Sequence, residues 1–207
     1  MGKQIHLKNI ERLFKKSSII DFKSLERVIG VKKNSNYAKL LVSNMLKQGK
    51  IKKIGKGIYT KFSESSLAVF AFKPAYLGLQ SSLSFHGVWE QEVIPVILTT
   101  KKVRVGIRKV LDSNILVRNI DKKHFFGYSL LKDGNFYLPY SDLEKTLIDM
   151  ITFNQTLDDD TLKEIKKKID KKKISLYLKR YNSRTRKIVQ DKLKHLPPKK
   201  LKFPKAH

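Results

Sequence analysis

The chain has 207 residues and a hydrophobic content of 41%, which indicates one or two folded domains rather than a disordered polypeptide. It contains no cysteine, which excludes a disulfide framework and a cysteine-based metal site. The sequence shows no apolar signal region and no apolar run long enough to cross a bilayer. We therefore expect a cytoplasmic protein without a membrane partner.

The formal net charge is +27, from 45 Lys and Arg residues against 18 Asp and Glu residues. Residues 1–62 carry 16 basic and 3 acidic side chains, and residues 161–207 carry 18 and 3. Residues 63–160 carry 11 and 12 and are nearly neutral. Two basic ends around a neutral middle favour a polyanion that contacts both ends. Solvated lysine faces without any partner would give the same charges.

Residues 1–62 follow the element order of a winged helix-turn-helix. Apolar residues at helical spacing predict a first helix around residues 7–14, and a short extended piece follows at 19–20. A second helix is expected to begin at Asp21, whose carboxylate can cap the first turn, and to end at Gly30.

A third helix is expected between Asn34 and Gly49, followed by two β-prone runs, 51–54 and 58–61, around the turn 55–57. In a winged helix, such a helix enters the major groove and a lysine on the hairpin, the wing, meets phosphate. A small α/β domain with no DNA-binding role can contain the same pattern. The DNA-contacting residues predicted for this module are Lys33, Ser35, Asn36, Tyr37, Lys39, Ser43, Lys47, Lys53 and Lys56.

Residues 63–196 are expected to form an α+β domain with a small, mostly antiparallel sheet and C-terminal helices. A helix is predicted over 75–85 and another over 143–153. Pro95 lies inside the β-prone run 93–99, which favours an edge position or a strand start. The other strand candidates are 103–107, 115–120, 125–130 and 136–140.

The C-terminal region is expected to be helical and strongly basic. Acidic residues at 158–160 predict a helix start, a second helix covers 174–181, a third begins with Ser183 as its cap, and residues 197–207 form a basic tail. Basic side chains crowd around the break between the last two helices. Because like charges repel, we predict that this group also contacts phosphates. Its members are Lys179, Arg180, Arg184, Arg186 and Lys187.

Several blocks of the sequence resemble the AbiEi family of antitoxins. Residues 82–95 resemble that family's SALxxHGLxxQxP block, residues 56–59 resemble its GxGxY hairpin, and residues 126–127 with 143–149 resemble its fG…pEKALLDLL block. The order and spacing of these blocks match over roughly residues 5–195.

The resemblance implies an N-terminal winged helix that binds inverted repeats in double-stranded DNA of its own promoter and represses transcription. It also implies a C-terminal domain that counteracts a nucleotidyltransferase-like toxin encoded nearby, without forming a stable complex. The sequence departs from the family pattern at Ser84, where alanine or leucine is common, at Val88, where leucine is common, and in its strongly basic C-terminal end.

No catalytic or metal-binding pattern stands out in the sequence. The histidines have no ligand spacing, so we expect no metal and no other cofactor. Residues 142–145 resemble a nuclease carboxylate–lysine cluster but are better interpreted as the first turn of a capped helix, and His86 as a hydrogen-bonded structural residue at a helix end. The sequence favours a sequence-specific repressor and antitoxin that is not an enzyme. A nuclease, and a DNA- or RNA-binding protein without sequence preference, remain the alternatives.

Overall fold

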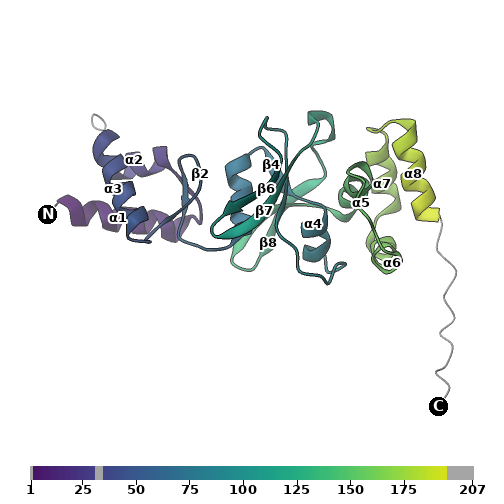
Figure 1. Cartoon of the computed structure of the whole chain (residues 1–207), viewed down its shortest axis with the longest axis horizontal. Coiled ribbons are helices and arrows are strands. Elements are labelled where there is room, and N and C mark those ends of the chain that lie inside the picture. Colours follow the sequence, from purple (N-terminus) through teal and green to yellow (C-terminus); the bar gives the residue numbers. More distant parts are fainter. Residues whose placement is uncertain (1, 31–34, 195–207) are drawn as a thin grey trace, which may run out of the picture. The chain divides into compact units, whose positions relative to one another are not determined.

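The computed structural model describes residues 2–30 and 35–194, and Figure 1 shows their elements in chain order. The chain divides into two compact units. The first unit comprises Met1–Leu77, Ile94–Ile120 and Leu130–Pro139, and the second comprises Gly78–Val93, Asp121–Ser129 and Tyr140–His207. The domain boundary expected after residue 62 falls inside the first unit and stays a prediction.

The second and third helices have the ends that their local sequence predicts, whereas the first extends beyond the expected residues 7–14 at both ends. The three helices are α1 (Gly2–Lys16), α2 (Phe22–Ile29) and α3 (Ser35–Lys47). The Asp21 carboxylate accepts a hydrogen bond of 2.7 Å from the Ser24 amide at the start of α2. Gly30 ends α2 with a φ of 75°, and Gly49 follows α3 with a φ of 67°, a region that glycine adopts without strain.

A small antiparallel sheet completes this N-terminal module, residues 2–62 of the first unit. Its strands are β1 (Ile20–Asp21), β2 (Lys52–Gly55) and β3 (Ile58–Thr60), in the order β1-β3-β2. Gly57, with a φ of 69°, lies in the turn of the β2–β3 hairpin, as predicted. One apolar core joins the helices and the sheet, because Ile10, Leu25, Leu41 and Tyr59 are buried together.

A larger, mixed sheet of six strands follows, so the α+β fold class is confirmed. The strands are β4 (Ala75–Leu77), β5 (Val96–Thr99), β6 (Gly106–Val110), β7 (Ser113–Asn119), β8 (Tyr128–Asp133) and β9 (Phe136–Ser141). They lie in the order β6-β7-β5-β4-β9-β8. The sequence predicted a small, mostly antiparallel sheet. The observed sheet has six strands, and its strands β5 and β7 run parallel. A short, buried 3-10 helix, η1 (Ser65–Phe72), precedes β4.

The helix predicted over 75–85 is wrong in its first part. Ala75 to Leu77 are buried and pair antiparallel with β5, so long-range pairing overrides the helical spacing. The helix is only α4 (Gln80–Phe85), and Leu79, with a φ of 52°, separates it from the strand. Pro95 lies just before β5, so it removes no donor from the ladder and the strand is central rather than at an edge.

Strands β6 and β8 begin later than the sequence indicates. A tight turn at Leu111–Asp112 joins β6 to β7, and this shifts both strands of the hairpin toward it. A 3-10 turn, η2 (Lys122–His124), and Gly127, with a φ of 69°, occupy the first part of the run expected to form β8. The tertiary pairing partner, rather than the local β-propensity, thus sets where these strands start.

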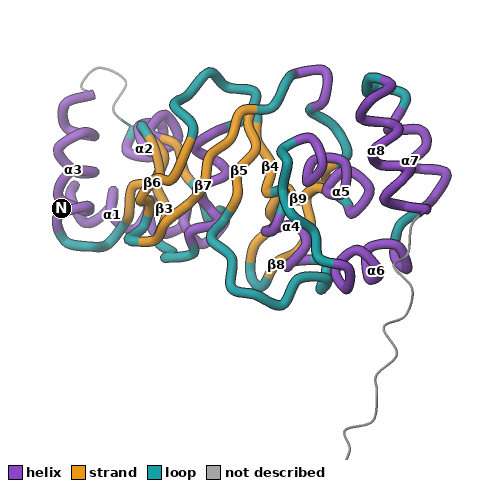
Figure 2. The backbone as a smooth tube through the Cα atoms, turned by 45° about the vertical axis from the view of Figure 1, so that its right-hand side comes forward, coloured by secondary structure: helices purple, strands orange, loops and turns teal. Residues whose placement is uncertain are grey.

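The second unit is built around helix α5. Its helices are α5 (Leu143–Thr152), α6 (Asp159–Lys168), α7 (Lys171–Leu178) and α8 (Ser183–Lys194). Figure 2 shows α6, α7 and α8 beside α5, and all three pack on it. Asp142 and Asp158 cap α5 and α6 as predicted. At α8 the cap is Asn182, whose side-chain oxygen accepts from the Thr185 amide at 2.8 Å, rather than Ser183.

The basic tail predicted at 197–207 lies outside the described residues. In the described part of the chain, no helix combines the length and the apolar character that a bilayer crossing needs.

Candidate nucleic-acid interface

Helix α3 separates its apolar and polar residues onto two faces. Its buried face consists of Ala38, Leu41, Val42 and Met45, which are at most 4% exposed. Four of the residues predicted to contact DNA are exposed on the other side of the helix: Asn36, Lys39, Ser43 and Lys47. Their spacing of three and four residues places them on one face, which we call the α3 polar face.

The other residues predicted around α3 have different positions. Lys33 lies outside the described residues, and Ser35 is the first residue of α3, with a side chain that is not described. Tyr37 is half-buried, and its ring meets the His6 ring edge-on at 5.8 Å between centroids. Tyr37 therefore packs against α1 as well as bordering the α3 polar face.

The β2–β3 hairpin presents the two lysines that were predicted to contact phosphate. Lys53 and Lys56 are both exposed, and neither pairs with a carboxylate within the described residues. The hairpin is fixed by close packing, because a Cβ built on Gly55 would lie 2.6 Å from the Cβ of Ala71 in η1. A residue larger than glycine at position 55 would push the hairpin away from η1.

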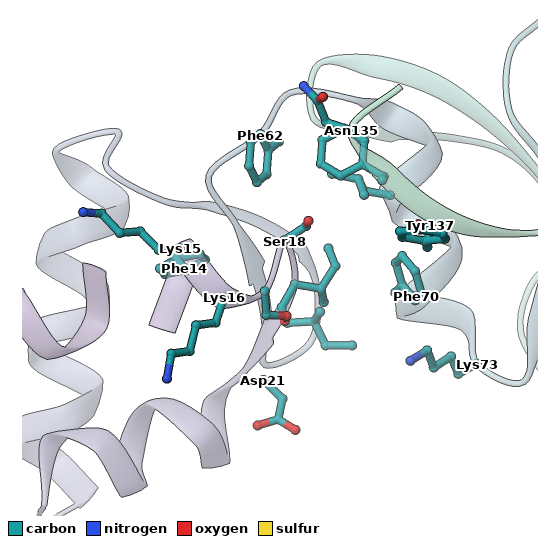
Figure 3. A pocket seen from close by; sticks show the side chains of 15 residues that line it. Phe14, Lys15, Lys16, Ser18, Asp21, Phe62, Phe70, Lys73, Asn135 and Tyr137 are labelled. Carbon is teal, nitrogen blue, oxygen red and sulfur yellow. The ribbon is translucent and has the colours of Figure 1, made fainter. Parts of the chain in front are cut away.

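A pocket of about 750 Å³ lies within the first unit, between the end of α1 and the strand β9. Figure 3 shows Lys15 and Lys16 on one side of it and Phe70, Lys73 and Tyr137 on the other. In the described part of the chain, these three lysines form no ion pair. The lining of rings and cations fits an anion with an apolar body, but it includes no residue predicted to contact DNA.

The second predicted basic group lies at the junction of α7 and α8, in the second unit, and all five of its members are exposed. Two of them are engaged within the unit. The Arg180 guanidinium lies 4.4 Å from the centroid of the Phe126 ring, and Arg186 Nε donates to the Tyr181 carbonyl at 2.7 Å. Lys179, Arg184 and Lys187 form no ion pair with a described carboxylate, so they are the members best placed to meet an anion.

Charged side chains are buried inside the second unit, which no pattern in the sequence indicated. Lys145 and Asp149, one turn apart on α5, are 0% and 1% exposed and form a hydrogen-bonded ion pair. Burial lowers the pKa of Lys145, while the Asp149 carboxylate opposes that shift. The Tyr181 hydroxyl is buried nearby without a described partner, and desolvation raises its pKa, with the charge of Asp149 adding to the shift. No pattern of spacing marks such a pair, because an i, i+4 Lys–Asp pair is ordinarily a surface feature.

A second set of charges joins α5 to α7. The Lys173 ammonium lies 3.1 Å from both the Asp142 and the Glu144 carboxylates, and these carboxylates raise its pKa against the effect of partial burial. The Tyr177 hydroxyl donates to Asp142 at 2.8 Å, and burial together with this carboxylate raises the pKa of Tyr177 to about 12. The residues that resemble a nuclease cluster therefore cap α5 and hold α7 against it.

Most of two blocks that resemble the AbiEi family, residues 82–93 and residues 126–127 with 143–149, meet inside this unit, whereas residues 56–59 belong to the first unit. The Ser82 hydroxyl and His86 Nε2 both bond the Ser141 carbonyl, at 2.7 and 2.9 Å, so His86 is a hydrogen-bonded residue at the end of α4, as expected. A Cβ built on Gly127 would lie 2.9 Å from the Cβ of Lys145, which places that glycine directly against α5. These blocks thus contribute to a buried polar framework. Among the described residues, no group of three or more His, Cys, Asp or Glu side chains is placed to hold a metal ion.

Comparison with known proteins shows the fold of this chain. No family model and no curated protein matches it. The chain is similar to the crystal structure of the RV2827C protein from Mycobacterium tuberculosis, with a TM-score of 0.62 over 91% of this chain and 76% of that one. The identity is 12%, so the similarity establishes a shared α+β architecture.

Proposed function

We propose that this protein is a sequence-specific DNA-binding repressor and that residues 1–62 act as its winged helix-turn-helix. The observation that carries the proposal is the α3 polar face, whose amide, hydroxyl and ammonium groups are exposed on a helix that a lysine-tipped hairpin follows in the chain. Such groups match the donors and acceptors of base edges, and the lysines of the hairpin match phosphate.

The element order supports the same function. Three helices are followed by an antiparallel hairpin, and this hairpin pairs with a short strand before α2. In a winged helix, this arrangement brings a helix to the major groove and a wing to the DNA backbone. The charge of the module, 16 basic against 3 acidic residues in 1–62, supplies the attraction for the duplex.

We also propose membership of the AbiEi family and the antitoxin activity that this implies. The support is the resemblance of residues 82–95, 126–127 and 143–149, of which all but residues 94–95 belong to the second unit. In this proposal the protein represses its own promoter at inverted repeats and relieves a nucleotidyltransferase-like toxin, and it acts without enzymatic activity.

Competition binding tests the first proposal. Labelled DNA from the upstream region of the gene is titrated with the full-length protein, and unlabelled promoter fragment or random duplex of equal length competes. We expect the promoter fragment to compete at least 1,000-fold better, on the order of the usual specificity ratio. Equal competition would instead favour binding without sequence preference, and cutting of plasmid in magnesium or manganese would favour a nuclease.

A rescue experiment separates repression from antitoxicity. The full-length variant Asn36→Ala, Lys39→Ala, Lys56→Ala is expressed from an unrelated promoter together with the neighbouring toxin candidate. We expect it to restore growth although it no longer binds DNA, because the second unit is intact. Failure to restore growth, at a protein level equal to wild type, would show that the antitoxin activity depends on DNA binding.

A further inference from the structure

A second basic hairpin is hidden in the nearly neutral middle of the chain. Residues 101–109 contain five basic and no acidic side chains, whereas residues 63–100 and 110–160 contain 6 basic and 12 acidic ones. Four of the five cations are exposed: Lys101, Lys102, Arg104 and Lys109. The net charge of −1 over residues 63–160 therefore conceals a concentrated positive segment. We use the name 101–113 hairpin for residues 101–113, which comprise this segment, the end of β6, the turn at 111–112 and the first residue of β7.

The 101–113 hairpin is held in a defined conformation. Arg108 donates from its guanidinium to the Arg104 carbonyl, and its guanidinium carbon lies 5.5 Å from the centroid of the Phe72 ring. At the tip, Leu111 and Asp112 have φ values of 51° and 63°, the positive values that a two-residue type I′ turn requires. For leucine this conformation is strained, by an energy on the order of 1 kcal/mol, so the surrounding structure must impose it.

The same segment, η1, fixes both basic hairpins of the first unit. Ala71 packs against Gly55 of the β2–β3 hairpin, and the next residue, Phe72, lies beneath Arg108 of the 101–113 hairpin. Consecutive residues of one buried helix thus hold two lysine-bearing hairpins next to each other. Their relative position is determined by packing within the unit rather than by a flexible connection.

The two hairpins border one hollow of about 500 Å³. Lys53 and Lys56 contribute from one side and Lys109 from the other, with Asp112 as the single acidic residue in the lining. Within the described residues none of the three ammonium groups forms an ion pair. The lining thus carries three ammonium groups against one carboxylate. The cations repel one another, and an anion that they share removes that repulsion.

From this geometry we infer that the 101–113 hairpin is a second phosphate-binding element for the duplex. It contacts the backbone next to the phosphates that Lys53 and Lys56 meet, so the DNA-binding surface continues beyond residue 62 into the mixed sheet. The inference rests on the proposed function, because it takes double-stranded DNA as the polyanion. Phosphate contacts position a protein without reading sequence, so the hairpin adds affinity rather than specificity.

Salt dependence of binding tests this inference. Each phosphate contact contributes about −0.9 to the slope of log affinity against log salt concentration. The variant Lys102→Ala, Arg104→Ala, Lys109→Ala is expected to flatten the slope by about two to three units on specific and random DNA alike. Arg108 is left intact because it supports the fold. The control Lys122→Ala, Lys132→Ala, Lys172→Ala removes the same charge from exposed positions elsewhere. Its slope should flatten by no more than about a third of the flattening seen in the first variant.

The outcomes distinguish the two proposals. If wild-type protein fails to bind duplex DNA at all, the proposed function is refuted and this inference falls with it. If wild-type protein binds the promoter specifically but the hairpin variant keeps its slope, only the second phosphate-binding element is refuted. Equal flattening in the hairpin variant and the control would also refute it, since the effect would then come from net charge alone.

A position-specific measurement is possible because the natural chain has no cysteine. Lys109→Cys supplies a single thiol for an iron-chelate reagent that cleaves nearby DNA backbone, and Lys132→Cys is the matched control at an exposed position. We expect strand cleavage beside the bound site from position 109 and none above background from position 132. Absence of cleavage from position 109, in a complex that forms with normal affinity, would overturn the inference.

Discussion

Helices α3 and α5 place their charged side chains in opposite ways. Both lysines of α3 are exposed and pair with no described carboxylate, while an apolar face alone attaches the helix to its unit. Helix α5 is buried from Leu143 to Met150, and its charges are buried with partners: Lys145 with Asp149, and Glu144 with Lys173.

The difference separates charges that serve binding from charges that serve folding. A cation left in water without a carboxylate costs the fold little and remains free for an external anion. A buried charge loses its hydration, so it is tolerated only with a close partner, and removing that partner exposes the whole cost of burial. We therefore expect substitutions on α3 to alter binding and substitutions on α5 to alter stability.

The largest effect is expected from Asp149→Ala. It leaves the Lys145 ammonium buried without its carboxylate, and breaking such a pair lowers the free energy of unfolding by about 3–5 kcal/mol. The single tryptophan, Trp89, belongs to the second unit, so its fluorescence during urea unfolding reports on that unit. The double variant Lys145→Met, Asp149→Leu should recover most of the loss. Equal instability of the double variant would show that packing, rather than the unpaired charge, is responsible.

The pH dependence of Asp149→Ala sharpens this prediction. Burial lowers the pKa of Lys145 in the folded state, and loss of Asp149 removes a group that raised it. The unfolded chain, with a lysine pKa near 10.5, then binds more protons than the folded chain at alkaline pH. The loss of stability of the variant relative to wild type should therefore shrink as the pH increases toward 10.5. A loss that stays constant up to that pH would contradict the assigned cause.

Asn36→Ala should act on binding alone. Asn36 is exposed near the start of α3, where its amide can contact a base edge, so we expect a loss of about 1–3 kcal/mol on the promoter site and little change on random DNA. Gel-shift titration on both DNAs measures it, and the melting temperature should remain that of wild type. Equal losses on the two DNAs would show that Asn36 does not read sequence.

Asp21→Ala is expected to have a smaller effect, on the stability of the N-terminal module. It removes the cap of α2, which typically lowers stability by about 1 kcal/mol. Hydrogen bonds from the Ser24 amide and hydroxyl hold the pKa of Asp21 below its usual value of 3.8. Its contribution is therefore present above pH 3.8 and lost as the pH falls through the folded-state pKa. Amide exchange of residues 22–29 at neutral and acidic pH measures the difference, which should disappear in acid.

The smallest effect is expected from Arg184→Ala at the α7–α8 junction. If Arg184 contacts one phosphate, its removal flattens the salt slope of DNA binding by about 0.9 and leaves base discrimination unchanged. Arg180→Ala is a less suitable probe, because it also removes the packing of the guanidinium on Phe126. An unchanged slope would indicate that this basic group meets water or a different acidic partner.

Local chemistry made the helix ends predictable. Asp21, Asp142 and Asp158 each accept an amide hydrogen bond three residues on, and Gly30 and Gly49 adopt positive φ, so side chain and backbone preferences within one turn are sufficient. The exposed residues of α3 followed in the same way, because the buried stripe determines which residues remain outside.

Features that depend on distant partners were not predictable. Residues 75–77 have helical spacing but pair with β5, and the turn Leu111–Asp112 lacks the Asn-Gly or Asp-Gly pattern that marks a type I′ hairpin. Lys145 has the local sequence of a surface lysine, but elements packed around α5, with Gly127 and the Phe126 ring against this side chain, bury it. In each case the decisive contact comes from a residue far away in the sequence.

The paired charges on α5 also restrict how this chain can evolve. A single substitution at Lys145 or Asp149 passes through a protein with an unpaired buried charge, whereas a change at both positions can reach a stable apolar interior. Two simultaneous mutations are rare, so the route between the two stable states is closed to stepwise change. Positions on the α3 polar face carry no such constraint, and one mutation at a time can retune what they bind while the interior of the second unit stays as it is.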